Sequence, residues 1–196
     1  MAHSGFIRDT TKAIHRLLQA GVQISSDRPL QILTGAPDRT QIARSLPCLS
    51  VYLYRIEERG DLYRPEKIVE GRSGKSTLRY RDPPIYMTLR FAVLFWGRTP
   101  DEEHRLIGAA LGVLLETPHL EEGQGFEAES FQSGERISLK LTSPFELSDQ
   151  NEILASLGLS LRPVLACSAT ARLDSKRIAT IRTVSHRVAR VNELES

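Results

Sequence analysis

The segment Gly74–Thr77, with the sequence Gly-Lys-Ser-Thr, matches the end of a phosphate-binding loop. Such a loop reads Gly-x-x-x-x-Gly-Lys-Ser/Thr, because a buried strand leads into backbone N–H groups that hold phosphate and a helix follows. The first glycine of that pattern would stand at position 69, where the sequence has Val69, and Pro83 and Pro84 prevent a helix downstream. We therefore interpret residues 70–84 as a polar, glycine-rich surface loop between two strands.

The other residue types that carry out catalysis or bind metals do not group in the sequence. The five histidines are scattered singly, with no second ligand at metal-site spacing, and no Gly-x-Ser-x-Gly motif of a serine hydrolase occurs. The acid pairs Glu57-Glu58 and Glu121-Glu122 lie beside turn residues, where a solvated role is the more common one. We therefore predict no catalytic residue, no metal ion and no cofactor, and a protein that is not an enzyme.

Length and composition favour one soluble domain. The chain has 196 residues and a formal net charge of +2, so charge alone does not indicate a nucleic-acid partner. Cys48 and Cys167 lie in apolar, strand-like stretches without ligand spacing, which favours a reducing compartment over a disulfide framework. The first residues lack the continuous apolar run of a secretory signal, so we expect a cytoplasmic location and no membrane insertion.

The spacing of apolar residues predicts an α+β fold with a mixed or antiparallel sheet packed by helices. The expected core helix spans about 99–117; it begins with a Thr99-Pro100 cap and is apolar nearly all round. In this helix Gly108 and Gly112 are expected to allow close packing onto the sheet. Further helices are predicted over 5–20 and 146–158, and strands over 29–37, 47–64, 83–97, 135–143 and 162–174.

The C-terminal segment 176–196 differs from the compact body predicted for residues 1–175. Residues 176–191 are β-branched and contain five Lys and Arg but no acidic residue. The apolar residues do not keep to one face, so the strand has a weakly specified register. The segment is therefore either an ordinary edge strand or an arm that pairs with a sheet of a second protein, and the sequence leaves both interpretations open.

The ordered pieces of the sequence resemble one protein family. The pieces are "PCLSVYLYRIEERGDLYR", "PPIYMTLRFAVLFWG", "DEEHRLIGAALGVLLETPHL" and "LSDQNEILASLGLSLRPVLACSATARLD". In this order they are similar to the tail-terminator, or cap, proteins of extracellular contractile injection systems of the antifeeding-prophage type. The resemblance covers roughly residues 5–175.

The resemblance implies a structural role without catalysis. Cap proteins of this family form a hexameric ring that ends the inner tube and the contractile sheath at the baseplate-distal end and couples the two. The implied partners are further copies of the chain, the inner tube protein and the sheath protein, in a particle assembled in the cytoplasm. The C-terminal arm is then the candidate sheath contact, through Ile178, Ile181, Arg182, Val184, Arg187, Val188 and Arg190.

Two other functions remain as alternatives. One is an assembly or scaffolding factor that does not stay in a finished particle. The other is a nucleic-acid-binding module that uses the basic tail and the arginine-rich loop, for example Arg79 and Arg81, to contact phosphate. Against nucleic acid, no helix concentrates basic residues and no aromatic RNA-binding motif occurs. We therefore expect no nucleic-acid partner.

Overall fold

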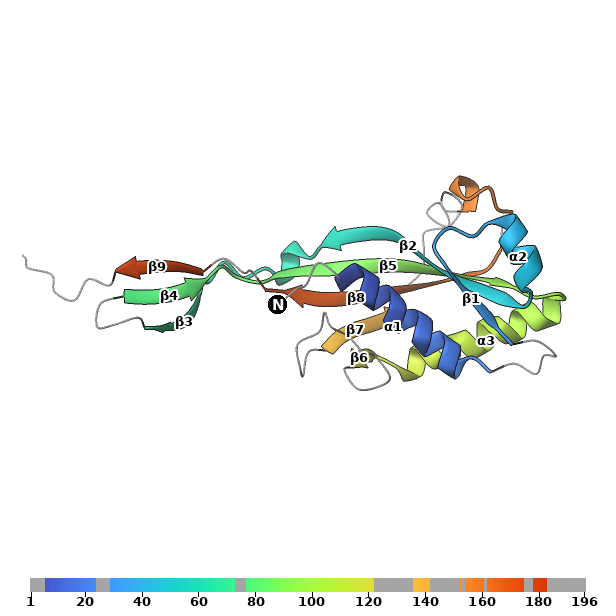
Figure 1. Cartoon of the computed structure of the whole chain (residues 1–196), viewed down its shortest axis with the longest axis horizontal. Helices are drawn as coiled ribbons and strands as arrows, with labels where there is room; N and C mark the ends of the chain where they lie inside the picture. The colour runs from blue at the N-terminus through green and yellow to red at the C-terminus, as the bar shows by residue number, and fades with distance from the viewer. Residues whose placement is uncertain are drawn as a thin grey trace, which may run out of the picture.

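The computed structural model describes residues 6–23, 29–72, 77–121, 136–141, 152, 154–160, 162–174 and 178–182. Figure 1 shows a body of sheet and helices with a narrow arm at one end. The elements, in chain order, are α1 (Phe6–Gly21), β1 (Gln31–Thr34), α2 (Arg39–Ser45), β2 (Cys48–Glu58), the 3-10 helix η1 (Gly60–Leu62), β3 (Ile68–Arg72), β4 (Thr77–Arg81), β5 (Ile85–Trp96), α3 (Pro100–Glu116), β6 (His119–Glu121), β7 (Arg136–Leu141), β8 (Val164–Leu173) and β9 (Ile178–Arg182).

The body contains a mixed six-stranded sheet in the order β1-β2-β5-β8-β7-β6. Strand β1 is parallel to β2, and the other neighbours are antiparallel. The sequence-based prediction of an α+β fold with a mixed sheet packed by helices is therefore confirmed.

Strand β5 is at the centre of the sheet and is buried on both faces. It pairs with β2 on one side and with β8 on the other. Phe91 and Phe95 point into the cluster made with α1 and α3, whereas Leu94 and Trp96 point into a second cluster made with Ile42 of α2. A strand covered on both faces reads as a nearly continuous apolar run, and β5 has that composition.

Helix α3 buries one stripe of side chains rather than its whole circumference. The Thr99 hydroxyl accepts a hydrogen bond from the Glu102 amide at 3.2 Å, which confirms the predicted cap. Leu106, Ala110 and Leu114, at a spacing of four residues, are the buried positions. The predicted bounds of this helix and its place in the core are therefore confirmed, and of its apolar residues only this stripe is buried.

The prediction that Gly108 and Gly112 allow α3 to pack closely onto the sheet is wrong. A Cβ atom added to either glycine would meet nothing within 4 Å. The close approach lies elsewhere: a Cβ on Gly21, at the end of α1, would lie 2.6 Å from Cγ2 of Val113. It is this third glycine that lets α1 and α3 pack side by side across the sheet.

Two other predicted boundaries differ from the structure. Strand β2 ends at Glu58 rather than at residue 64, and the predicted loop 70–84 contains the end of β3 and the whole of β4. The short elements α2 and β6 had no sequence prediction, because seven and three residues are too few to show a period. Residues 146–151 of the helix predicted over 146–158 lie outside the described residues, while Gly158, with φ +64°, stands where that predicted helix ends.

None of the helices in the described part of the chain is both long and apolar enough to cross a membrane.

We predict that Phe91→Ala and Leu114→Ala each lower the free energy of unfolding by about 2–5 kcal/mol, because each leaves a cavity in place of a buried side chain. Leu111→Ala on the same helix is the matched control. Leu111 is half-buried, and its loss should be below about 2 kcal/mol. Urea denaturation followed by circular dichroism measures all three. Equal losses for Leu111→Ala and Leu114→Ala would contradict the assignment of the buried stripe.

Candidate functional site

The arm is a second, three-stranded sheet in the order β3-β4-β9, formed from segments far apart in the sequence. Figure 1 shows it beyond the ends of β5 and β8, with β4 leading into β5 and β8 leading into β9. Strand β4 lies in the middle and pairs antiparallel with both neighbours. Each strand of the arm is therefore tied to a strand of the body, and the arm projects from the body.

The arm decides the question raised by the Gly-Lys-Ser-Thr string. Residues 73–76 are outside the described part, but the flanking strands pair with each other, with Val69 opposite Tyr80. A phosphate-binding loop requires a helix after the lysine, and Thr77–Arg81 is a strand instead. The helix that a phosphate-binding loop requires is therefore not present at Thr77–Arg81, and the strands on either side of residues 73–76 form a β-hairpin where the sequence predicted a loop.

The two faces of the arm differ in chemistry. One face carries the row Val69–Tyr80–Ala179, followed by Leu78. The ammonium of Lys67 lies 4.3 Å from the centroid of the Tyr80 ring, a cation–π contact. This face, called the apolar arm face below, has Val69 62% exposed. A sheet with one apolar face gains stability when a second layer covers that face.

The opposite face of the arm combines basic and aliphatic side chains. Its row nearest the body places Arg81 of β4 between the exposed Ile68 and Ile178, and a further row places Arg79 beside Thr180. Arg79 is exposed. The chemical difference between the faces follows from strand alternation, since Leu78 and Tyr80 point one way and Arg79 and Arg81 the other.

The predicted sheath-contact residues fall in β9 or beyond it. Ile178, Ile181 and Arg182 lie in β9, at register positions opposite Arg81, Leu78 and Thr77. Strand β9 therefore pairs with its own chain through one edge, and its other edge is the outer edge of the sheet. The remaining predicted residues, Val184, Arg187, Val188 and Arg190, are outside the described part.

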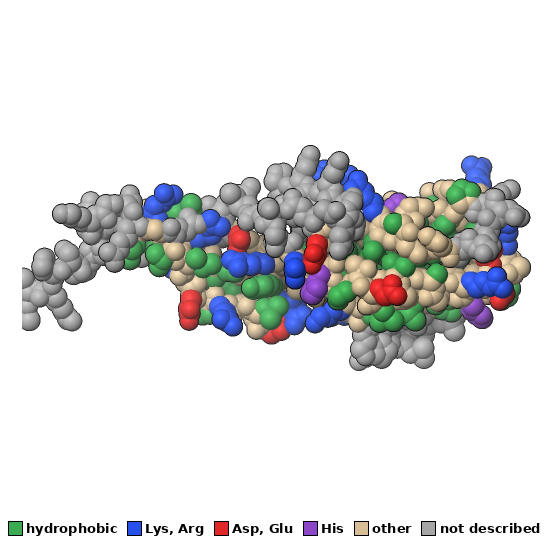
Figure 2. Space-filling view, turned by 90° about the horizontal axis from the view of Figure 1, so that it is seen from below, with side chains coloured by type: hydrophobic (Ala, Val, Ile, Leu, Met, Phe, Trp, Pro, Cys, Tyr) green, Lys and Arg blue, Asp and Glu red, His purple; other side chains and the backbone are tan. Residues whose placement is uncertain are grey.

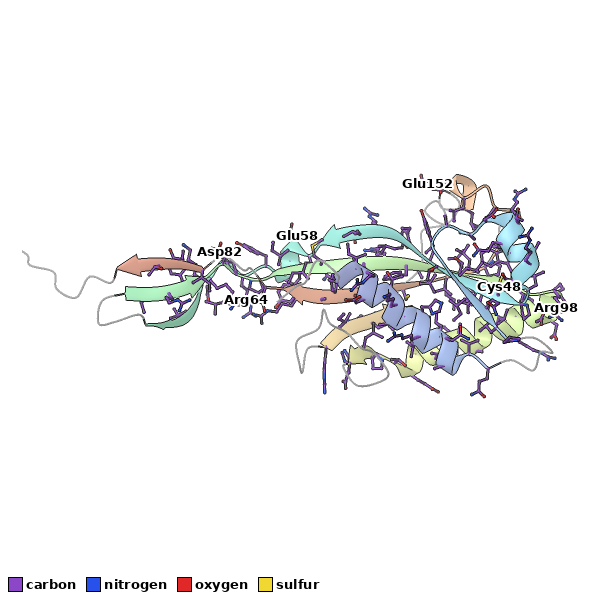
Figure 3. The ribbon with its side chains drawn as sticks, viewed as in Figure 1. Cys48, Glu58, Arg64, Asp82, Arg98 and Glu152 are labelled. Atoms are coloured by element: carbon purple, nitrogen blue, oxygen red, sulfur yellow. The ribbon has the colours of Figure 1, made fainter. Side chains whose placement is uncertain are left out.

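A hollow of about 490 Å³ lies at the root of the arm. Its lining comes from η1, the segment before β3 and the ends of β5 and β8: Asp61, Leu62, Arg64, Glu66, Lys67, Ile68, Pro84, Tyr86 and Arg172. Figure 3 shows Arg64 and Asp82 at this root. Asp61 pairs with Arg59 at 2.6 Å, a hydrogen bond that lowers the pKa of the carboxyl, and Arg172 pairs with Asp174 at 2.8 Å. Several of the charges around the hollow are thus engaged in local pairs.

Glu57, the first residue of the acid pair at 57–58, forms ion pairs that connect two strands of the sheet. Glu57 accepts ion pairs from Arg55 and Arg90, each at 2.7 Å, and holds β2 against β5. The hydrogen bond from Arg90 to Glu57 is the main cause that raises the pKa of Arg90. The predicted solvated role is wrong for Glu57, which is half-buried between two arginines.

Both cysteine thiols are buried, and His15 faces a backbone carbonyl. Burial raises the pKa of the Cys48 thiol to about 11 and that of Cys167 to about 12, so neither is a thiolate at neutral pH. The Nε2 atom of His15 lies 3.1 Å from the carbonyl oxygen of Ile32. In the ranges that the structure describes, no three His, Cys, Asp or Glu side chains gather as metal ligands. The arm is accordingly the better candidate for a functional site.

Charge is divided unevenly between the arm and the body. The described residues of the arm and its root, 64–72, 77–82 and 178–182, contain six Lys and Arg against three Asp and Glu, a formal charge of +3, so the rest of the chain carries −1. Figure 2 shows Lys and Arg side chains along the arm and its root, with a few acidic ones between them. Such a distribution favours an arm that binds a surface of opposite charge.

Sequence reasoning missed the β3–β4 hairpin, although a signal was present. The run 77–81 alternates polar and apolar residues, and Ile68 and Val69 stand on the other side of the Ser-Gly pair at 73–74. The same Gly and Ser residues are also typical of a loop, so the sequence pattern alone does not separate a loop from a hairpin.

The comparisons with known proteins agree on one fold. The model of the Pvc16 N-terminal domain family matches residues 9–186. A sheath/tube terminator of the extracellular contractile injection system PVC, in its extended state, is similar to 96% of this chain at 20% identity and a TM-score of 0.67. The tube-terminating cap of the anti-feeding prophage is similar to 94% of it at 17% identity and a TM-score of 0.64. No curated protein sequence matches.

This chain spans less than two thirds of the two solved proteins, namely 65% of the PVC terminator and 61% of the anti-feeding prophage cap. The similarity therefore concerns the fold of the part that is shared.

We predict that Lys75→Ala leaves folding unchanged and that the chain binds no ATP, because Thr77–Arg81, which follows the lysine in the sequence, is a strand and not the helix that a phosphate-binding loop requires. Isothermal titration of the wild-type chain with magnesium ATP should give no saturable heat. Saturable binding that disappears in Lys75→Ala would contradict this reading of the hairpin.

Proposed function

The chain belongs to the Pvc16 N-terminal domain family, and from that premise we propose that it is a structural cap of a contractile injection particle. In this proposal it ends the inner tube and the sheath at the baseplate-distal end and joins the two, without catalysing a reaction. Six copies form the ring, and the particle is assembled in the cytoplasm.

The observation that carries the proposal is the extent of the family match. Residues 9–186 include both the body and the arm strand β9, so the arm lies within the region that the family model matches. The two similar structures are named as a sheath/tube terminator and a tube-terminating cap. A rigid six-stranded body suits an end plate, and a projecting arm suits a link to a second layer.

In the same proposal the outer edge of β9 and the residues after it bind the sheath protein. An exposed edge presents unpaired N–H and C=O groups to which an extended segment can add as a further strand. Each main-chain hydrogen bond formed in this way contributes about 1 kcal/mol. The contact residues in this proposal are Ile178, Ile181, Arg182, Val184, Arg187, Val188 and Arg190.

Electron microscopy of the purified chain mixed with the tube and sheath proteins of its particle tests this function. We expect the chain at one end of each tube and sheath held at that end. An assembly factor would instead be absent from finished tubes, and tubes of unchanged length without the chain at their ends would contradict the cap function.

Deletion of residues 183–196 separates the two halves of the function. This variant keeps β9 paired with β4, so the chain should fold and still cap tubes, while the sheath should detach at lower salt than with the full chain. A chain in which 183–196 is replaced by a Gly/Ser segment of the same length is the control for chain length and should behave as the deletion does. Sheath held at normal strength by both variants would show that the sheath contact lies elsewhere.

A further inference from the structure

We propose that the arm of one copy docks on helix α3 of a second copy of this chain. The apolar arm face would lie against the C-terminal end of α3, around Leu115 and Glu116. This inference names the partner of the arm and rests on the proposed ring, but its test uses the purified chain without tube or sheath.

The arm supplies an apolar surface next to a positive charge. Val69 is 62% exposed on the apolar arm face, beside Tyr80 and Leu78. Lys67, two residues before Val69, holds its ammonium over the Tyr80 ring. One side of the sheet therefore presents an exposed aliphatic side chain, an aromatic ring and a lysine next to one another.

The end of α3 supplies the complementary surface. Leu115 is 64% exposed, and Glu116 beside it is exposed as well. The last turn of α3 contains no basic residue, so the negative end of the helix dipole and the Glu116 carboxylate stand together without compensation from the helix itself. A lysine placed there by another molecule would be stabilised by both.

The two surfaces are complementary: each presents an exposed aliphatic side chain, and the charges beside these side chains have opposite signs. Leu115 and Val69 are the two most exposed large hydrophobic side chains of the described residues, with the next at 48%. Leu115 has the acidic neighbour Glu116, and Val69 has the basic neighbour Lys67, in a chain whose described arm and root residues carry a formal charge of +3. Apolar contact flanked by opposite charges is the composition of a specific interface.

The two surfaces belong to different copies. Figure 1 shows the arm beyond the end of β8, whereas α3 lies along the body, so the arm does not reach α3 of its own chain. A contact between two different patches is heterologous, and repetition of such a contact closes a ring when the rotation between copies allows it. This arrangement leaves the outer edge of β9 free for the sheath.

Position-specific cross-linking tests the contact. The native Cys48 and Cys167 are both 0% exposed. The cysteine introduced by Val69→Cys or by Leu115→Cys is therefore the exposed thiol of that variant. With oxidised glutathione, a mixture of the two variants should form a disulfide-linked dimer, and either variant alone should form much less. Because a disulfide needs Cα atoms about 4.4–6.8 Å apart, the bond reports close contact. Glu152→Cys replaces Leu115→Cys as the exposed control and should give no dimer with Val69→Cys.

Charge exchange tests the same contact without cross-linking. Glu116→Lys should weaken self-association about tenfold in sedimentation velocity, although a lysine at a helix C-terminus favours the helix itself. Adding Lys67→Glu to Glu116→Lys should restore association, and Glu152→Lys should leave it unchanged. A wild-type chain that stays monomeric, or Glu116→Lys that associates as the wild type does, would overturn the proposal. A Val69→Cys chain that cross-links to tube or sheath protein but never to Leu115→Cys would overturn it as well.

Discussion

Strand β5 is the constraint on which the rest of the structure depends, because it is buried on both faces and paired along both edges. Its register with β2 and with β8 runs over about ten residues on each side. Two separate layers are therefore required: α1 and α3 over one face, and α2 with the helical residues around Leu154 over the other. The second layer covers one end of the sheet, and the Glu57–Arg90 ion pair occupies the same face further along.

The arm follows from this arrangement of strands. The chain enters β5 through β4 and leaves β8 into β9, so the same antiparallel order continues past the helices as a narrower sheet. A three-stranded sheet with one apolar face and no second layer is weakly stabilised on its own. The excess of basic side chains on the arm favours a covering layer whose surface is acidic, such as the end of α3 around Glu116 in a second copy.

The sequence predicted the elements in which local and tertiary signals agree. The alternation in 83–97 and the cap at Thr99 placed β5 and α3 to within about two residues, the usual uncertainty of element ends. Burial around α3 was not predictable, because an exposed Leu115 and a buried Leu114 look alike in composition. The pairing of β4 with β9 was not predictable either, since about a hundred residues separate them and register depends on the whole body. Of the arm, basic charge and β-branched composition were visible in the sequence, while its own sheet partner was not.

Hydrogen–deuterium exchange, read by mass spectrometry, tests most directly the central claim that the arm gains its covering layer from other molecules. In the dilute chain, amides of β3, β4 and β9 should exchange much faster than those of β2, β5 and β8. In the assembled ring or particle, the amides of the arm should become as protected as those of the body, while the central strands change little. Equal protection of arm and body in the dilute chain, or no added protection of the arm on assembly, would contradict the account.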